Sequence, residues 1–278
     1  MQRSNISGLC NRAGMSRQNY YSHRKRRAKL LIDEEFILSL VRRERREQPR
    51  LGTRKVLTLI KEELEENNAN VGRDRFFDLL RPNDLLIERK KAFIPKTTNS
   101  RHSLPVFKNL LKRYETTAPN QIWVSDLTYI RTEEGFIYGA LITDAYSRKI
   151  VGAYAGYTLE AEGCINALNG ALKELPKNRF PIHHSDRGCQ YCCHAYVDIL
   201  RKKGLSVSMT EENHCYENAM AERVNGILKQ EYGLDYTFST KEQAVTAFYE
   251  AVHLYNNRRP HMSLNYMIPA VVHMKEAA

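Results

Sequence analysis

The sequence predicts an α/β protein, with a mixed five-stranded sheet and flanking helices preceded by small all-helical modules. One observation behind this prediction is a change of pattern near residue 120, from basic helical segments to stretches rich in Val, Ile, Tyr and Trp. The other is the order of elements after that change, where three strands are followed by alternating helices and strands. A sheet with helices on its faces is the arrangement that buries such elements.

Composition excludes several classes of protein. The chain has 278 residues, 42% hydrophobic and 27% charged, which is typical of a soluble globular protein. No apolar run approaches the ~18 residues that a membrane span needs, and the first residues lack the apolar core of a secretory signal. The six cysteines are irregularly spaced and do not suggest a disulfide framework. We therefore expect a cytoplasmic protein without a membrane partner.

The positive charge is concentrated at the N-terminus. Residues 1–55 hold 15 Lys and Arg against five Asp and Glu, whereas the rest of the chain is nearly balanced, within a total net charge of +11. A polyanion is the natural partner of such a segment, and nucleic acid is the commonest one. The alternative is a basic segment that is only solvated.

Residues 1–30 predict a basic arm that resembles a helix-turn-helix. A short apolar-periodic segment from Ile6 meets Gly14, and Ser16 is a suitable N-cap for a second helix. We expect side chains of this arm to contact DNA bases or phosphates, namely Arg17, Gln18, Asn19, Arg24, Lys25 and Arg26. A small helical hairpin without DNA would show the same pattern.

Residues 31–94 predict a second helical DNA-binding module. Its expected elements are helices at 33–47, 53–64 and 72–80, a polar loop at 67–70, and a strand or extended arm at 83–95. Arg73 and Arg75 in its last helix are candidate DNA contacts, although a plain packing module is equally compatible. Residues 95–118, rich in Pro, Thr, Ser and Asn around one short amphipathic helix, predict a linker.

Residues 119–278 predict the catalytic domain and a C-terminal helical tail. The first three strands form an antiparallel meander, because the turn at Glu133–Gly135 is short. The expected strands are 121–132, 135–148, 149–158, 181–185 and 205–209. The expected helices are 159–175, 190–203, 218–231 and 240–256, before a Pro-containing tail.

Three acidic residues occupy positions that suggest a metal site. Asp126 interrupts the first strand, Asp186 ends the fourth, and Glu222 follows the start of a helix at Asn218. If the first and fourth strands are neighbours, the three carboxylates would meet and repel each other unless a cation lies between them. Oxygen-only ligands suit Mg²⁺ or Mn²⁺, and two such ions can act on a phosphodiester. The alternative is three unrelated surface acids.

Three sequence blocks carry a family resemblance. They are WVSDLTY around Asp126, HSDRGCQY around Asp186 and NAMAERVNGILK around Glu222, and 35 residues separate the last two acids. This combination resembles DDE transposases and retroviral integrases, closest to the OrfB transposases of bacterial insertion sequence family three. The segments DAYSRKIVG (144–152) and YNNRRPHMSLNYMIP (255–269) resemble the same family. The likeness covers roughly residues 10 to 272.

The resemblance implies a ribonuclease-H-like catalytic fold with two Mg²⁺ ions, for which Mn²⁺ can substitute. Asp126, Asp186 and Glu222 match the family's metal ligands and catalytic residues. It also implies cleavage of DNA 3′ ends and strand transfer, with the terminal inverted repeats of an insertion sequence and target DNA as partners. The resemblance also implies that the protein forms a homo-oligomer on DNA, has an OrfA partner protein and is located at the bacterial nucleoid.

Three further residues take their expected roles from position. Asn225 and Lys229 follow Glu222 by three and seven residues, so they share its helix face and should point at DNA. Asp144 matches a turn aspartate of the family that is not a ligand.

Three other interpretations remain. The first is a catalytically silent DNA-binding regulator or partner subunit derived from a transposase. The second is a nuclease that cuts but does not join. The third is a zinc site built from CQYCCH (189–194) with His183, His184, His214 and Cys215, although no standard zinc spacing is complete.

Overall fold

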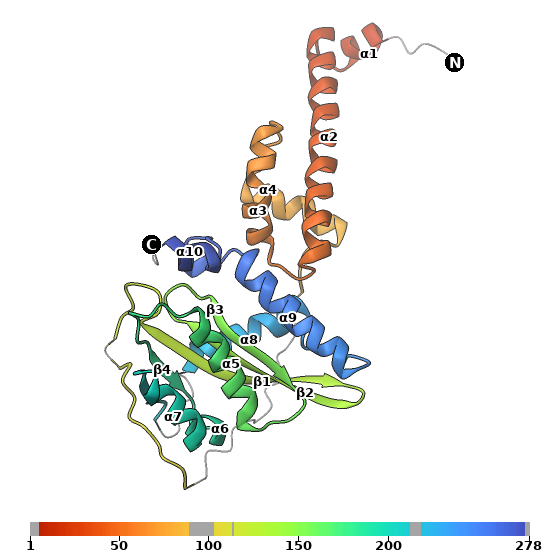
Figure 1. Ribbon diagram of the computed structural model, residues 1–278. Coiled ribbons are helices and arrows are strands. Elements are labelled where there is room, and N and C mark those ends of the chain that lie inside the picture. Colours follow the sequence, from red (N-terminus) through yellow and green to blue (C-terminus); the bar gives the residue numbers. More distant parts are fainter. Residues whose placement is uncertain (1–5, 89–102, 113, 212–217, 276–278) are drawn as a thin grey trace. The chain divides into compact units, whose positions relative to one another are not determined.

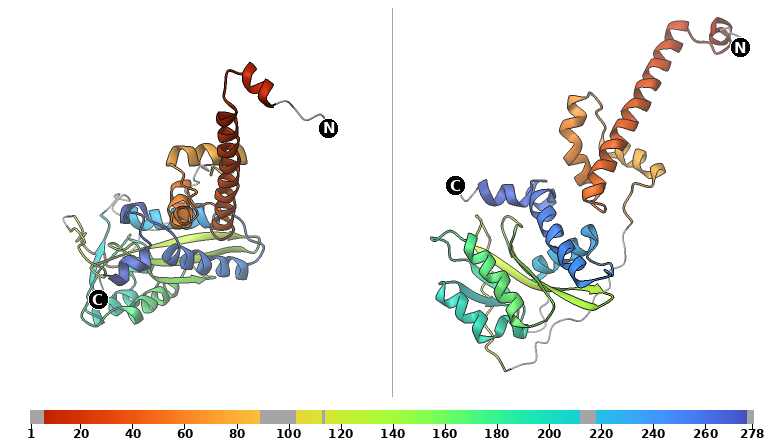
Figure 2. Two further views of the ribbon diagram at one scale, coloured as in Figure 1. Left: turned by 90° about the horizontal axis from the view of Figure 1, so that it is seen from above. Right: turned by 45° about the vertical axis from the view of Figure 1, so that its right-hand side comes forward.

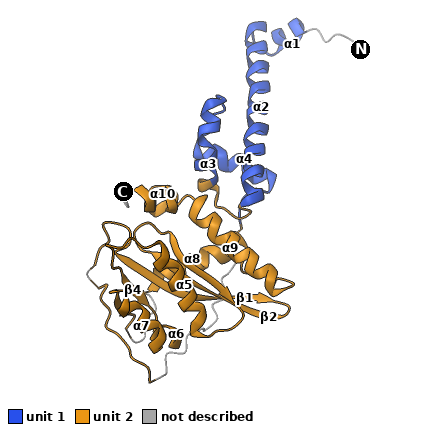
Figure 3. Cartoon of the chain, in the orientation of Figure 1, with its two compact units in different colours: residues 1–47, 56–87 blue, residues 48–55, 88–278 orange. Residues whose placement is uncertain are grey.

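The structure is a computed structural model that describes residues 6–88, 103–112, 114–211 and 218–275. The chain forms two compact units, one of residues 1–47 and 56–87 and the other of residues 48–55 and 88–278 (Figure 3). We describe each unit by itself. No helix in the described parts of the chain is both long and apolar enough to span a membrane.

The first unit is helical. It contains α1 (Ile6–Arg12), α2 (Arg17–Glu47), most of α3 (Thr53–Glu66) and α4 (Arg73–Leu80). Gly14 turns the chain with a φ of 64°, and Ser16 Oγ accepts a hydrogen bond from the backbone N–H of Asn19 at 3.1 Å. The predicted turn and N-cap are therefore present.

Helix α2 continues further than the sequence pattern indicated. It runs unbroken for 31 residues, across the point at residue 30 where the sequence analysis separates its first two modules. The physical reason is local, because residues 28–32 (AKLLI) contain neither Gly nor Pro to end a helix. Only the second half of α2 has buried side chains, beginning at Ile37.

The segment between the two units differs from its prediction. A short 3₁₀ helix, Arg81–Asn83, follows α4, and there is no strand up to Glu88; residues 89–95 of the predicted arm lie outside the described residues. The amphipathic helix expected in the linker is absent from residues 103–112 and 114–118. Leu104 and Phe107 instead pack against the core of the second unit, and the backbone N–H of Leu110 donates to Ser208 Oγ at 2.9 Å. These contacts place the segment against the second unit, so packing overrides its helical periodicity.

The second unit is built on a mixed five-stranded sheet. Its strands are β1 (Ile122–Thr132), β2 (Gly135–Asp144), β3 (Ile150–Gly156), β4 (Ile182–Ser185) and β5 (Ser206–Met209), in the order β3-β2-β1-β4-β5. The first three strands are antiparallel, whereas β4 is parallel to β1 and β5 is parallel to β4. The predicted meander and the predicted neighbourhood of the first and fourth strands are both confirmed (Figure 1).

Helices cover both faces of this sheet (Figure 2). Helices α5 (Ala161–Glu174), α6 (Cys189–Cys192) and α7 (His194–Lys202) form one hydrophobic cluster with Trp123, which is fully buried. Helices α8 (Ala219–Tyr232) and α9 (Lys241–Asn257) form a second cluster on the other face.

One element departs from the prediction for this unit. The helix expected at 190–203 is interrupted at Cys193, which has an extended backbone. The C-terminal tail, for which the sequence analysis expected helix without giving bounds, contains a 3₁₀ helix, Met262–Leu264, and the helix α10, Pro269–Lys275.

Candidate active site

Asp126 lies in β1, and Asp186 comes directly after the neighbouring strand β4. The parallel pairing of β1 with β4 ends at Val124 opposite His184, so each aspartate comes two residues beyond this last pair. Both side chains are partly buried. Asp126 Oδ1 accepts the backbone N–H of Leu127, and Asp186 Oδ1 accepts that of Gly188, each at 2.9 Å. The strand order therefore brings together two acids that are 60 residues apart in the sequence.

Helix α8 is tied to β1 on both sides of Glu222. Asn218, at the start of the helix, donates from Nδ2 to the backbone oxygen of Ser125 at 3.1 Å. Asn225 donates from Nδ2 to Asp126 Oδ2 at 2.8 Å. Glu222 lies between these anchors, in the first helical turn, and its side chain is exposed. The face of α8 that carries Glu222 and Asn225 is thus directed at Asp126, as the spacing predicted. Asn225, however, which was expected to point at DNA, binds the carboxylate of Asp126.

The carboxylates influence one another electrostatically. Burial raises the pKa of Asp126 to about 7, and repulsion from Asp186 and Glu222 adds to the effect. The hydrogen bonds from Asn225 and Leu127 act in the opposite direction. Burial also lowers the pKa of Lys229, whereas the charge of Asp126 raises it, so this lysine lies within the field of the site.

The donor set fits a hard divalent cation. Carboxylate oxygens are the ligands that Mg²⁺ prefers, and the repulsion at Asp126 is what a bound cation would relieve. Among the described residues, the structure contains no group of three His, Cys, Asp or Glu side chains close enough together to hold a metal ion. Residues 212–217, which lead into α8 and Glu222, lie outside that description.

The histidines and cysteines around Asp186 have other partners. His183 Nε2 lies 2.7 Å from Ser125 Oγ and 2.8 Å from Tyr196 Oη, and His184 Nδ1 lies 2.8 Å from Ser208 Oγ. Cys192 is buried with its sulfur 3.6 Å from that of Met209. His214 and Cys215 of the proposed zinc set lie outside the described residues.

Two further acids have structural partners. Asp144 is buried at the end of β2, where Oδ2 accepts the backbone N–H of Asn120 at 2.7 Å and Oδ1 accepts that of Ser147 at 2.8 Å. Glu231, at the end of α8, accepts from Lys55 Nζ at 2.6 Å and from Arg259 Nε at 2.8 Å. The sequence analysis missed this ion-paired cluster, whose one visible signal is Arg259 in the RRPH segment of the tail.

The other predicted DNA contacts belong to the helical unit. All lie on α2 or α4 and all are exposed: Arg17, Gln18, Asn19, Arg24, Lys25, Arg26, Arg73 and Arg75. Arg73 pairs with Asp74 at 2.8 Å and Arg75 pairs with Glu34 at 3.3 Å. DNA contact by these residues, and by Asn225 and Lys229, stays a prediction.

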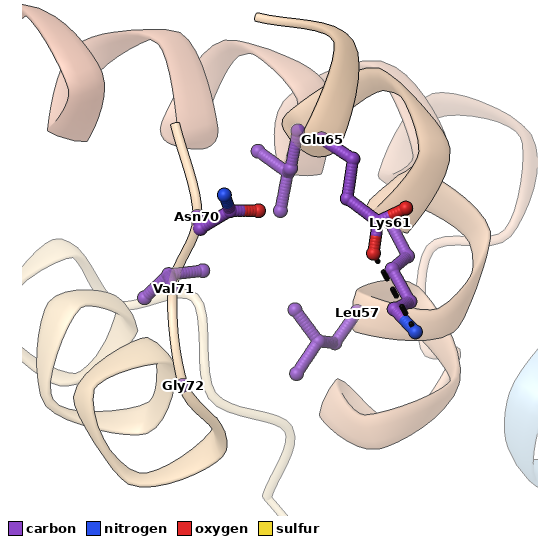
Figure 4. Close-up of a pocket in the computed structure, with 7 residues that line it drawn as sticks. Leu57, Lys61, Glu65, Asn70, Val71 and Gly72 are labelled. Carbon is purple, nitrogen blue, oxygen red and sulfur yellow. Dashed lines mark ion pairs between the residues drawn. The ribbon is translucent and has the colours of Figure 1, made fainter. Parts of the chain in front are cut away.

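A pocket of about 300 Å³ also lies in the helical unit (Figure 4). Leu57, Lys61 and Glu65 of α3 face the Asn70–Gly72 segment across it, and Lys61 pairs with Glu65 at 3.6 Å. None of the three predicted catalytic acids lines it.

Comparisons with known proteins agree with this geometry. Two family descriptions, both named "Integrase core domain", match residues 116–215 and 203–269. The chain is 38% identical over 276 residues to an uncharacterized 31 kDa protein of insertion element IS600 from Shigella sonnei, covering 96% of this chain and 98% of that protein. The chain belongs to the DDE transposase and integrase superfamily. Its five-stranded sheet is the ribonuclease-H-like sheet that this membership implies.

Other proteins of lower sequence identity or coverage match only part of this chain. It is 37% identical over 153 residues to transposase InsF of insertion sequence IS3A from Escherichia coli K12, a match to 55% of this chain and 53% of that protein. It is also similar to the magnesium-bound catalytic core domain of HTLV-2 integrase, with 18% identity, a TM-score of 0.45, and coverage of 57% of this chain and 99% of that one.

Proposed function

We propose that this chain is the transposase of an insertion sequence, which cleaves DNA 3′ ends and joins them to target DNA. The observation that carries the proposal is the position of Asp126 in β1 next to the end of β4, which Asp186 directly follows, with Asn225 of the Glu222-bearing helix bonded to Asp126. A near full-length relative that belongs to an insertion element supports the biological setting.

In this proposal, Asp126, Asp186 and Glu222 hold two Mg²⁺ ions, for which Mn²⁺ can substitute. When bound, such ions activate a water or a 3′-hydroxyl and stabilise the leaving oxygen of a phosphodiester. No covalent link between protein and DNA is needed, because the freed 3′-hydroxyl is itself the attacking group of the joining step.

The chain's own residues then have separate tasks. Asn225 orients Asp126 through its 2.8 Å hydrogen bond and keeps one carboxylate oxygen engaged. Lys229, one helical turn further along α8, supplies a positive charge near Asp126 that suits a DNA phosphate. The basic helical unit binds the terminal inverted repeats, and its excess of Lys and Arg favours DNA of any sequence at low salt.

The same proposal includes partners. Two DNA ends must be held together for joining, so we propose a homo-oligomer on DNA. An OrfA protein that supplies part of the end recognition is a further proposed partner.

The test is an assay with labelled element ends and Mg²⁺. Asp126→Asn, Asp186→Asn and Glu222→Gln should each abolish cleavage and joining, since each removes a charged metal ligand, while DNA binding stays within about twofold of the wild type. Asp198→Asn is the matched control, because Asp198 is an exposed acid on α7. Normal joining by any of the three variants would refute the site. Recovery of EDTA-treated protein by Zn²⁺ alone would count against an oxygen-ligated Mg²⁺ site.

A further inference from the structure

The N-terminal half of α2 carries apolar side chains that the described part of the chain leaves in water. Leu31 is 60% exposed and Ile32 is 69% exposed, although both belong to a helix of 31 residues. The buried side chains of α2 begin only at Ile37, and the half of the helix before them extends beyond α3 and α4 (Figure 3). Contiguous apolar surface of this kind is typical of a contact with a second molecule.

The exposed apolar residues belong to one stripe along the helix. Residues three, four or seven positions apart share a helix face, and this spacing joins Tyr21 to Ala28 and Ala28 to Leu31 and Ile32. Charged residues continue the same face in both directions. We call the following exposed residues the α2 stripe: Tyr21, Arg24, Lys25, Ala28, Leu31, Ile32 and Glu35.

The α2 stripe faces away from the packed side of the helix. Ile37, Leu40 and Val41, which are buried, also share one helix face. With about 3.6 residues per turn, that face lies on the opposite side of α2 from the stripe. Leu30, which is 42% exposed, continues the packed side instead. The stripe is therefore a separate surface and not an open edge of the core of this unit.

The charges of the α2 stripe have opposite signs at its two ends. Arg24 and Lys25 lie about one helical turn before Ala28, and Glu35 lies one turn after Leu31. If two α2 helices paired in parallel, each charge would face its own copy and repel it. If they pair antiparallel about a point near residue 30, Glu35 of each copy faces Arg24 and Lys25 of the other. The stripe is thus complementary to itself in the antiparallel direction only.

The same antiparallel register also covers the apolar residues. It places Ala28 of each copy opposite Leu31 and Ile32 of the other, so a small side chain faces two large ones on both sides of the twofold axis. At its ends Tyr21 faces the exposed Ser39, which gives a contact about 27 Å long. The apolar centre and the charged flanks are therefore satisfied by one arrangement.

Other contacts of these residues are compatible with this pairing. Glu35 pairs with Arg42 at 3.1 Å, but both side chains are exposed, so the pair contributes little, and a carboxylate can accept further hydrogen bonds. DNA alone would neutralise Arg24 and Lys25 but would leave Leu31 and Ile32 in water. A second copy of the chain covers both kinds of residue.

We propose that the α2 stripe is a dimer contact, in which two copies of this chain pair their α2 helices antiparallel in the absence of DNA. The inference rests on the homo-oligomer of the proposed function and deepens it, because it names the surface and the direction of the pairing. Arg26 lies outside the stripe and remains available to DNA in the dimer.

The first test measures self-association of the full-length protein by sedimentation velocity, without DNA and in EDTA. The wild type should form a dimer whose fraction rises with protein concentration. The double substitution Leu31→Ser, Ile32→Ser should raise the dissociation constant by about tenfold or more, because it removes the apolar centre of the contact from both copies. Met274→Ser, at a 63% exposed position of α10, is the matched control and should associate like the wild type. Circular dichroism should show the same helix content in all variants, because the substituted side chains are exposed.

The second test reverses the charges of the α2 stripe. Glu35→Lys, and separately the double substitution Arg24→Glu, Lys25→Glu, should each weaken self-association by about tenfold or more, because each places like charges opposite one another at both ends of the antiparallel contact. An equimolar mixture of these two variants should regain a dimer with one copy of each, which native mass spectrometry detects. In a parallel contact like residues already face each other, so neither variant would associate less than the wild type.

The outcomes separate this inference from the proposed function. A wild type that is monomeric at every concentration, or a Leu31→Ser, Ile32→Ser variant that associates like the wild type, would overturn the dimer contact. Failure of the mixed charge variants to associate would overturn the antiparallel pairing. A wild type that forms the dimer but cleaves no DNA would contradict the proposed function alone, and one that cleaves and joins DNA without forming the dimer would contradict this inference alone.

Discussion

Asn225 controls how Asp126 presents its carboxylate. Its amide holds one oxygen of Asp126 at 2.8 Å, and its own Oδ1 is buried without a hydrogen-bond partner. A group that orients a metal ligand is typically worth 10- to 100-fold in metal affinity or activity. In the proposed metal site, the neutral side chain of Asn225 is therefore expected to matter as well as the three acids.

We expect Asn225→Ala to raise the Mg²⁺ concentration for half-maximal cleavage by about tenfold, because Asp126 loses the donor that fixes its orientation. A Mg²⁺ titration of the cleavage rate measures this effect. Asn169→Ala, at an exposed position of α5, is the control and should titrate like the wild type. An unchanged Mg²⁺ requirement in Asn225→Ala would show that the hydrogen bond does not orient a ligand.

His183 makes the stability of the second unit sensitive to acid. Burial lowers its pKa to about 3, and the neighbouring His184 adds to the shift. The unfolded chain, with an ordinary pKa of about 6.5, therefore binds the proton first. The stabilising contribution is complete above pH 6.5 and is lost as the pH falls through 6.5 toward 3, at about 1.4 kcal/mol for each pH unit.

Urea unfolding at pH 7 and pH 5 tests this prediction. The free energy of unfolding of the wild type should fall by about 2 kcal/mol more than that of His183→Gln, which has no proton to gain. His261, whose pKa is lowered to about 4, also makes the free energy of unfolding fall as the pH falls, but it is present in both proteins, so its effect cancels in the comparison. His253→Gln, exposed on α9, should behave like the wild type. Equal losses in wild type and His183→Gln would contradict the assignment.

The positions of the three acids in expected strands and a helix, together with the family resemblance of their motifs, singled them out, but the sequence could not predict their partners. Asp126, Asp186 and Glu222 stood out because their motifs are local in sequence. The bond between Asn225 and Asp126 joins residues 99 positions apart, and the hydrogen bonds of His183 depend on how β4 packs against α7. The zinc hypothesis arose for the same reason, because composition shows a cluster of His and Cys without showing which side chains already have partners.

At the scale of elements, one glycine fixes how closely α9 packs on the sheet. A Cβ atom at Gly139 in β2 would lie 2.5 Å from Cε2 of the buried Phe248 and 3.0 Å from Cγ2 of Thr128. The ring of Phe248 fills the space above this residue. The absence of a side chain at Gly139 is therefore required by the contact between β2 and α9.

Gly139→Ala should lower the free energy of unfolding by about 1–3 kcal/mol, because Phe248 must move in a close-packed core. Gly170→Ala is the matched control in α5, where a Cβ would meet nothing within 4 Å. It should raise the free energy of unfolding by about 0.5–1 kcal/mol, because alanine favours a helix. Thermal or urea denaturation measures both. Equal effects of the two substitutions would show that the contact is not tight.

Elements with strong local patterns were predictable, and those set by packing were not. The strands β1, β2 and β3 follow from their β-branched and aromatic residues and from a turn that ends in Gly135, whose φ is 112°. The linker segment has helical periodicity at Leu104, Phe107 and Leu111, yet these side chains pack at separate places on the second unit. Such tertiary contacts have no signature in a single sequence.

On the scale of the whole molecule, charge and chemistry are divided along the chain. Nearly all of the net charge of +11 lies in residues 1–55, whereas the three acids lie between residues 126 and 222. The family resemblance was predictable from motifs spread over most of the chain. The continuity of α2 across residue 30 was not, because a capped helix start at Ser16 gives no information about where the helix ends.

This division predicts which residues control the salt dependence of DNA binding. Each phosphate contact that is lost lowers the slope of log Kd against log salt concentration by about 0.9. The triple substitution Arg24→Gln, Lys25→Gln, Arg26→Gln should therefore lower the slope by about 3 if all three residues contact phosphates, because each contact releases a counterion. Binding isotherms of element-end DNA at several salt concentrations give the slope.

The control for this experiment removes the same charge elsewhere. Lys173, Lys177 and Lys202 are exposed residues of the second unit, and their triple substitution to Gln changes the net charge equally. If DNA is held by the basic arm, this control should keep a slope within about 1 of the wild type. Equal slopes for the two triple variants would mean that net charge alone drives binding, and that α2 is not the DNA-contacting helix.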